Sequence, residues 1–376
     1  MTSPTLYVDV HILQDLPPSN INRDDNGTPK QAVYGGVSRL RVSSQAWKRA
    51  VRLEFAADLP KEATGVRTRR LTQLFTAELA ERGLPESDAT LLAAEAVKSL
   101  GITAGKKDDL SYLLFFSRGQ LDTMASAVAA AAGDLTQSKT IDKAMLELGL
   151  KETLRAGHSL DVALFGRMVA DLADLNVDAA SQVAHAISTH AAKTQFDYFT
   201  AVDDEQEEAE TGAGMIGTVE FNSATMYRFA TVAVPQLAAN LGDHAAAFDG
   251  VARFIRAFAL SMPTGHQTSF AARTRPALVL VVVRQDQPVN LVSAFERPVW
   301  PGQQGVMAGS QEALADFYQT EVQRWGDQPA LVVASYNAVD DKGHEKLVAA
   351  FGPSRPLDEV IEAVGGVLRG LGRDHD

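Results

Sequence analysis

The chain of 376 residues contains no cysteine. Disulfide bonds, zinc sites with thiolate ligands and cysteine nucleophiles are therefore excluded together. Long hydrophobic runs are also missing: the best one, residues 277–283, has the length of a strand and lies between Arg275 and Arg284. A transmembrane helix needs roughly 18 or more apolar residues, and the first residues lack the basic region of a secretion signal. We expect a cytoplasmic protein without membrane contact.

Acidic residues are absent from residues 26–53, although the chain as a whole carries 47 Asp and Glu against 35 Lys and Arg. The same segment holds six basic residues: Lys30, Arg39, Arg41, Lys48, Arg49 and Arg52. A solvated surface normally mixes charges of both signs. An acidic protein that gathers its positive charge in one segment is expected to bind an anion locally, and it is not expected to coat nucleic acid over its whole surface.

The hydrophobic pattern predicts both strands and helices, and the 45% hydrophobic content is enough for a sizeable core. Alternating or β-branched segments predict strands at residues 5–13, 181–190, 218–232, 276–283 and 330–336. Helical periodicity covers residues 44–59 and 235–261 and most of 60–176, whereas residues 15–36 indicate an ordered loop. This order predicts an α+β fold with a split βαβ, ferredoxin-like core that is interrupted by a helical insertion.

The predicted helix that begins at Ser43 or Ser44 has two distinct faces. Its apolar residues Trp47, Ala50, Val51 and Phe55 fall at helical spacing and predict the buried face. Gln45, Lys48, Arg49 and Arg52 follow the spacing i, i+3, i+4 and i+7, so that they form a polar stripe. The stripe is either an ordinary solvated face or, with the free N–H groups of the helix start, a site for a run of phosphates.

Three other patterns are weaker signals of a nucleotide, metal or base site. Residues 212–217, GAGMIG, satisfy the dinucleotide-binding spacing but lack a strand before them and a helix after them. His185 and His190 lie five residues apart, which favours structural histidines over a shared metal. Tyr227 and Phe229 lie on one strand face and favour core packing over base stacking.

Pairs of adjacent aspartates leave a catalytic alternative open. Asp24 with Asp25, and Asp203 with Asp204, could hold Mg²⁺ for a ribonuclease. Arg23, next to the first pair, favours a local ion pair or the capping of a turn instead. The sequence therefore carries a metal-dependent ribonuclease as an alternative to a binding protein.

Several contiguous stretches resemble the backbone subunit of the type I-E CRISPR surveillance complex, Cascade. They are PPSNINRDDNG, AVYGGVSRLRVSSQAWKRA, DVALFGRM, AHAISTHAAKTQFDYFTAVDD and GTVEFNSATMYRFA, in the order of that family. The resemblance implies a hand-shaped protein with a palm related to the RNA-recognition fold, helical fingers inserted into it, and a hairpin thumb. On this basis we expect palm segments at 1–59, 181–198 and 218–376, fingers at 60–180 and a thumb at 199–217.

The resemblance also implies roles for individual residues. Ser43, Gln45, Lys48 and Arg52, with Lys30 from the preceding loop, would hold the guide RNA backbone in the palm, and Arg49 joins them as part of the same stripe. Met168 resembles the family's apolar wedge beside a displaced nucleotide. Phe199 and Thr200 would begin the thumb and, with Met215 and Ile216, would contact the neighbouring subunit. The acidic residues 203–210, DDEQEEAE, depart from this pattern, because six acids are not expected to lie against phosphate.

We therefore expect a scaffold without catalytic activity, metal or cofactor that polymerises along CRISPR RNA and presents it to target DNA. Its partners would be guide RNA, target DNA through the guide, other copies of itself and other Cascade subunits. Sequence specificity would then come from base pairing. Besides the ribonuclease, one further alternative is a filament-forming protein that binds no nucleic acid and pairs its basic segment with the acidic segment of a neighbour.

Overall fold

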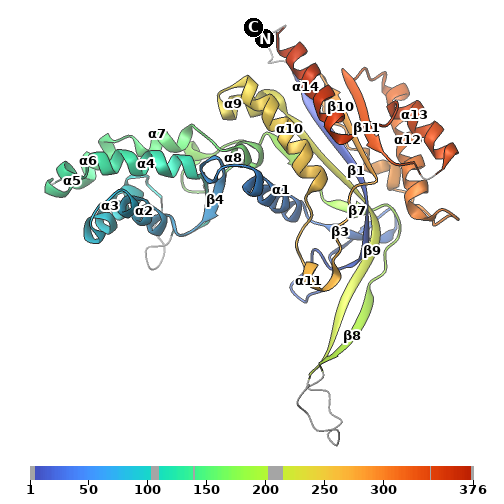
Figure 1. Ribbon diagram of the computed structural model, residues 1–376, viewed down its shortest axis with the longest axis horizontal. Helices are drawn as coiled ribbons and strands as arrows, with labels where there is room; N and C mark the ends of the chain where they lie inside the picture. The colour runs from blue at the N-terminus through green and yellow to red at the C-terminus, as the bar shows by residue number, and fades with distance from the viewer. Residues whose placement is uncertain (1–4, 103–109, 139, 202–214, 339, 374–376) are drawn as a thin grey trace, which may run out of the picture. The chain divides into compact units, whose positions relative to one another are not determined.

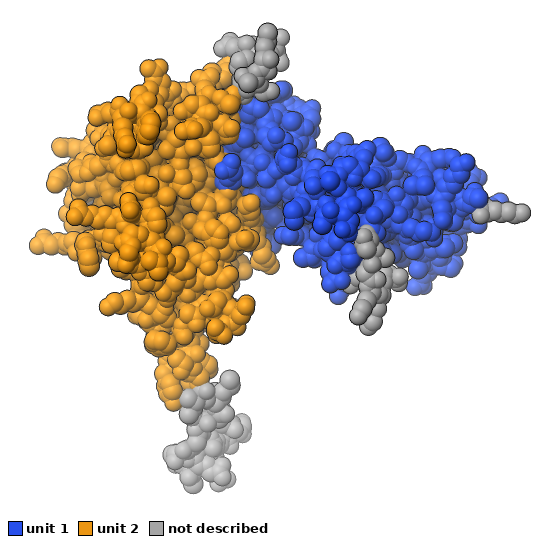
Figure 2. Space-filling view, turned by 180° about the vertical axis from the view of Figure 1, so that it is seen from behind, with its two compact units in different colours: residues 1–4, 52–182, 232–251 blue, residues 5–51, 183–231, 252–376 orange. Residues whose placement is uncertain are grey.

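The computed structural model describes residues 5–102, 110–138, 140–201, 215–338 and 340–373. Helices and a largely antiparallel sheet build an α+β protein, as the sequence predicts. The chain divides into two compact units (Figure 2). Unit 1 comprises residues 52–182 and 232–251, and unit 2 comprises residues 5–51, 183–231 and 252–376. Within the described segments, no helix is both long and apolar enough to cross a membrane.

A sheet whose strands differ in length forms the centre of unit 2 (Figure 1). Its strands follow the order β11 (Leu331–Tyr336), β10 (Leu278–Arg284), β1 (Tyr7–Ser19), β9 (Met215–Ala233), β7 (Ala186–Ser188), β3 (Val37–Val42) and β2 (Gln31–Tyr34). Two further strands, β6 (Ser181–Val183) and β8 (Gln195–Ala201), pair with β9.

The prediction of a loop over residues 15–36 is wrong at both ends, where the structure has strands. β1 continues to Ser19, and β2 begins at Gln31 and pairs with β3. The register between β1 and β10 covers only Tyr7 to Leu13, so that Pro17 and Pro18 lie beyond the part that pairs with β10. Prolines are tolerated there because no ladder hydrogen bond to β10 is required of them. The prolines therefore misled the sequence prediction.

Helices α12 (Gly305–Trp325) and α13 (Asp341–Phe351) cover one face of this sheet. Alternate β10 residues Leu278, Leu280 and Val282 pack with Leu314 and Phe351 in one hydrophobic core. Tyr227 and Phe229 of β9 belong to the same core, so the prediction that they are packing residues is confirmed. The remaining elements of this part are α11 (Gln267–Phe270), the short helix η3 (Leu291–Phe295) and α14 (Leu357–Arg373).

The helix predicted over residues 235–261 is two helices, α9 (Val234–Leu241) and α10 (His244–Leu260). Gly242 ends α9 with a φ of 73°, a left-handed conformation in which glycine has no steric cost. The sequence LGD therefore marks a helix end inside an otherwise continuous apolar pattern.

Unit 1 is mostly helical around its own hydrophobic core, which confirms the helical character predicted for residues 60–176. Its helices are α2 (Leu71–Glu81), α3 (Glu86–Ser99), α4 (Arg118–Ala130), α5 (Ala132–Gln137), α6 (Ile141–Glu147), α7 (Leu150–Arg155) and α8 (Leu160–Phe165), with short η1 (Lys61–Ala63) and η2 (Ala173–Leu175). A two-stranded sheet of β4 (Gly65–Thr68) and β5 (Leu114–Ser117) was not predicted. Strands of four residues are too short to show a period.

Candidate nucleic-acid interface

Helix α1 (Ser44–Asp58) carries the candidate interface, and its buried face is the predicted one. Trp47, Ala50, Val51 and Phe55 are all buried. The guanidinium carbon of Arg228, from β9, lies 3.7 Å from the Trp47 ring centroid and 4.6 Å from that of Phe258. Burial lowers the pKa of Arg228 to about 9, and the two rings contribute cation–π attraction that offsets part of its desolvation. This packing fixes the rotation of the helix.

The opposite face of α1 presents the predicted polar stripe. Gln45 and Arg49 are exposed, and Lys48 is half-buried, which lowers the pKa of its ammonium group. Among the described residues Arg49 forms no ion pair with a carboxylate. Positive charge without an internal counterion is available to an anionic ligand.

Asn22 brings Lys30 and Ser43 together at the start of α1. Its side-chain oxygen accepts a hydrogen bond from the Ser43 N–H at 2.8 Å, and its carbonyl accepts from the Lys30 N–H at 2.9 Å. The Ser43 carbonyl begins the helix by accepting from the Ala46 N–H at 3.0 Å. These bonds connect Lys30 to the start of α1, and Lys30, Ser43, Gln45, Lys48 and Arg49 all belong to unit 2.

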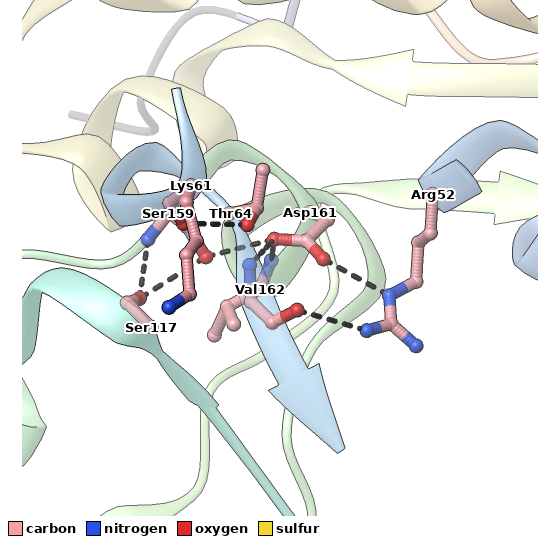
Figure 3. Close-up of polar contacts among 8 residues, drawn as sticks. Arg52, Lys61, Thr64, Ser117, Ser159, Asp161 and Val162 are labelled. Atoms are coloured by element: carbon pink, nitrogen blue, oxygen red, sulfur yellow. Dashed lines mark hydrogen bonds and ion pairs between the residues drawn. The ribbon is translucent and has the colours of Figure 1, made fainter. Parts of the chain in front are cut away.

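Arg52, the fourth member of the stripe, belongs to unit 1, and its guanidinium binds other groups of that unit (Figure 3). Its Nε lies 2.9 Å from the buried carboxylate of Asp161, and one Nη donates to the Gly65 carbonyl at 3.1 Å. Its guanidinium also lies 4.3 Å from the Phe115 ring centroid. Sequence spacing placed Arg52 on the polar face, but it could not show that a carboxylate from a distant segment pairs with it.

The side chain of Met168 is largely exposed to solvent, with 83% of the residue's surface accessible. Its neighbours are anchored: Arg167 is buried and donates to the Leu175 and Leu154 carbonyls, each at 2.7 Å, and the Val169 N–H donates to Asn176 at 2.6 Å. Met168 is therefore not part of the hydrophobic core. An exposed apolar side chain on a fixed backbone fits the predicted contact with a nucleotide, which stays a prediction.

The strands β8 and β9 form a long two-stranded ribbon (Figure 1). Its register pairs Phe199 with Gly217, Thr200 with Ile216 and Ala201 with Met215, so the four predicted thumb residues lie together. The Phe199 ring lies over Gly217, where a Cβ would come within 2.3 Å of it. The acidic residues 203–210 lie outside the described residues.

Phe196 and Tyr198 on β8 were not singled out from the sequence. They are 68% and 64% exposed, and their alternation with Asp197 places both on one face of the ribbon. The signal in the sequence was the alternation itself, QFDYF, which we noted only as part of the family resemblance.

The remaining sequence motifs find structural roles. Asp24 caps a turn, since its Oδ1 accepts from the N–H groups of Asn26 at 2.9 Å and Thr28 at 3.0 Å. His190 is held by the Thr225 N–H at 3.1 Å and the Ala191 carbonyl at 2.9 Å, as expected for a structural histidine. No group of three or more metal-ligating side chains occurs in the part of the chain that the structure describes. At residues 212–217, the described part begins a strand at Met215 and not a helix.

A family model described as CT1975-like protein matches residues 8–363. The chain belongs to the CT1975-like protein family. Two solved structures are similar to this family member over 95% of its length. One chain is described as "CRISPR RNA-guided surveillance complex, pre-nicking", with 34% sequence identity, a TM-score of 0.78 and 100% of that chain covered. The other, "CRISPR RNA-guided surveillance complex", has 30% identity, a TM-score of 0.72 and 99% coverage. No curated protein matches the sequence.

Proposed function

We propose that this CT1975-like protein is the guide-RNA-binding backbone subunit of a Cascade surveillance complex of type I-E. The observation that carries the proposal is the basic face of α1, continued by Lys30, in a segment without acids. Phosphate recognition by such a face needs no base contact, which suits a protein that binds guides of any sequence. The similarity to chains of RNA-guided surveillance complexes supports the same conclusion.

The topology supports a palm of the RNA-recognition type. β10, β1, β9 and β7 are consecutive neighbours in the sheet, and helices follow β1 and β9 along the chain. In sequence order these four strands read 4-1-3-2, the arrangement of a ferredoxin-like βαββαβ core. In this proposal unit 1 supplies the fingers, and the β8–β9 ribbon is the thumb that reaches the neighbouring copy.

The proposed scaffold is not catalytic and acts with guide RNA, target DNA bound through the guide, further copies of itself and other Cascade subunits. Of the two aspartate pairs that the ribonuclease alternative used, Asp203 and Asp204 lie outside the described residues. In the other pair, the Oδ1 atom of Asp24 already accepts from two backbone N–H groups of its own turn. A carboxylate oxygen that caps a turn is not free to bind Mg²⁺, and a Mg²⁺ site needs several free oxygen ligands.

Purification with candidate partner subunits tests the proposal. We expect RNA of discrete length to accompany the protein, seen as a high ultraviolet absorbance ratio and as a single band after extraction. The RNA should remain uncut when Mg²⁺ is added. Protein free of RNA that also fails to bind added single-stranded RNA would overturn the proposal, and cleavage that depends on metal would favour the ribonuclease.

A further inference from the structure

Arg41 lies at the end of β3 and is held at two points of its side chain. Its Nε donates to the Gln31 carbonyl at 3.2 Å, and its Nη1 lies 3.0 Å from Nδ1 of His185. Its main-chain N–H donates to the Lys30 carbonyl at 2.8 Å, so that Arg41 adjoins a residue of the interface described above. All four residues belong to unit 2.

The contact with Arg41 decides the protonation of His185. Arginine has only donors, so Nδ1 of His185 must accept, and the proton of the neutral ring is on Nε2. Burial, Arg41 and Lys30 together lower the pKa of His185, which keeps the ring neutral. The exposed surface of this group then offers the Nε2–H of His185, three N–H groups of Arg41 and the ammonium group of Lys30. These are all donors, and an oxyanion is the ligand that accepts from such groups.

Arg39, two residues earlier on the same strand, shows what a structural arginine does here. It is buried, and its donors go to the carbonyls of Tyr34 at 3.1 Å, Ser188 at 3.0 Å and Phe295 at 2.7 Å. Arg41 is partly exposed and forms no ion pair with a carboxylate in the described residues. Its charge is therefore not neutralised within the protein.

We propose that Arg41 and Lys30 form a second phosphate subsite, with His185 as the positioning residue that holds the guanidinium. A fixed guanidinium binds two phosphate oxygens in parallel, which a lysine cannot do. Through Asn22, which contacts both Lys30 and Ser43, the subsite continues the surface of α1. The inference rests on the proposed function and assigns the interface a ligand group, a phosphodiester of single-stranded RNA, at a place outside the helix.

Binding of a labelled single-stranded RNA of mixed sequence, measured by fluorescence anisotropy over a range of salt, tests the subsite. Arg41→Gln should weaken binding by about tenfold or more, the effect of losing a charged hydrogen bond. The slope of log affinity against log salt should become flatter by about 0.7. Arg41→Lys keeps the charge, so it should retain the slope but bind more weakly than the unaltered chain.

His185 is tested by two substitutions that differ in their ability to accept a hydrogen bond. His185→Gln keeps a side-chain oxygen for Arg41 and should retain RNA affinity, whereas His185→Ala should lower it with little change in the salt slope. A merely structural role for His185 would lower the melting temperature of both variants and leave RNA binding of the folded fraction unchanged. Arg324→Gln and His244→Gln, at exposed positions elsewhere, are matched controls and should have no effect.

The two proposals fail in different ways. If Lys48→Ala weakens RNA binding while both Arg41 variants match the unaltered chain in affinity and slope, the subsite is wrong and the proposed function stands. If the unaltered chain binds no RNA, the proposed function itself is wrong. Thermal melting of each variant shows that it is folded, and should Arg41→Gln not fold, the affinity of Arg41→Lys decides.

Discussion

Arginines show at the scale of single residues what sequence can and cannot predict. The acid-free segment identified Arg39, Arg41 and Arg52 together. Only the structure separates them: Arg39 is buried among carbonyls, Arg52 pairs with Asp161, and Arg41 keeps donors exposed. Each of them has one decisive partner more than a hundred residues away, Ser188 for Arg39, His185 for Arg41 and Asp161 for Arg52. Local spacing holds no information about these partners.

Removing Arg52 should destabilise the protein, because the carboxylate of Asp161 would remain buried without its counterion. Three donors at 2.8–3.1 Å, from Gly65, Ser159 and Val162, hold Oδ1 in place, so the carboxylate cannot turn to solvent (Figure 3). We expect Arg52→Ala to cost about 3 kcal/mol of unfolding free energy, the low end for a broken buried ion pair. Urea unfolding measures this.

A double variant is the control for this effect. Adding Asp161→Asn to Arg52→Ala removes the unpaired charge and should restore part of the lost stability, which a double-mutant cycle quantifies. Unchanged stability of Arg52→Ala together with weaker RNA binding would instead support the role that the family resemblance gives to Arg52.

The buried histidine of β1 should make stability depend on pH. Burial, with Arg284 nearby, lowers the pKa of His11 from 6.5 to about 3, and its Nδ1 lies 2.9 Å from the Tyr227 hydroxyl. Below pH 6.5, His11 therefore binds a proton in the unfolded chain but stays neutral in the folded chain, so acid favours unfolding. Between pH 7 and 5, His11 should remove about 2 kcal/mol of stability, at about 1.4 kcal/mol per pH unit.

Asp9, two residues before His11, acts in the opposite direction. Burial raises its pKa from 3.8 to about 6, so the folded chain binds the extra proton between these values and gains stability as the pH falls. Unfolding at pH 7 and 5 should therefore show only a small net change, and His11→Gln should gain stability on the same acidification. The exposed His344→Gln is the comparison; an equal response of both variants would contradict the assignment.

At the scale of elements, prediction succeeded where one periodicity ran long enough. Helix α1 has 15 residues, and its buried face agrees at every predicted position. The four-residue strands β4 and β5 were missed, and the end of β1 was hidden by two prolines. In these cases pairing with distant strands decides the conformation, and a local pattern cannot show it.

The two faces of α1 should respond differently to substitution. Trp47→Ala removes a buried side chain and uncovers Arg228, so we expect a loss of about 3–5 kcal/mol with or without RNA. Lys48→Ala should cost much less stability than Trp47→Ala, because Lys48 is only half-buried, but it should flatten the salt dependence of RNA binding by about 0.7. Urea unfolding and anisotropy titrations measure the two effects. A stable Trp47 variant with selective loss of RNA binding would show that the faces are reversed.

For the whole molecule, the sequence predicted the α+β class and the family. The thumb residues that the resemblance named together also lie near one another in the ribbon, while their contact with a neighbouring copy stays a prediction. Thr200 and Ile216 lie 16 positions apart and are direct cross-strand partners. Assembly could not be derived in the same way, because it depends on a second copy of the chain. The exposed aromatics Phe196 and Tyr198 show that the ribbon has apolar surface to bury, in line with a proposed thumb.

Shortening the ribbon tests whether it joins neighbouring copies. Ala201 and Met215 are opposite each other, so an Asn-Gly turn in place of residues 202–214 closes the hairpin without a change of register. The shortened chain should still bind RNA weakly through α1 but should form no ordered filaments on a long guide, as seen by electron microscopy or light scattering.

A charge variant separates the length of this segment from its acidity. Replacing the six acids of residues 203–210 by Asn or Gln should preserve filaments and change only their salt dependence, because exposed charge pairs contribute about 0–1 kcal/mol each. Loss of filaments in the charge variant would mean that the acids bind a basic surface of the neighbour. Full-length filaments from the shortened chain would remove the segment from the subunit contact, and the exposed aromatics of β8 would then have to hold the copies together.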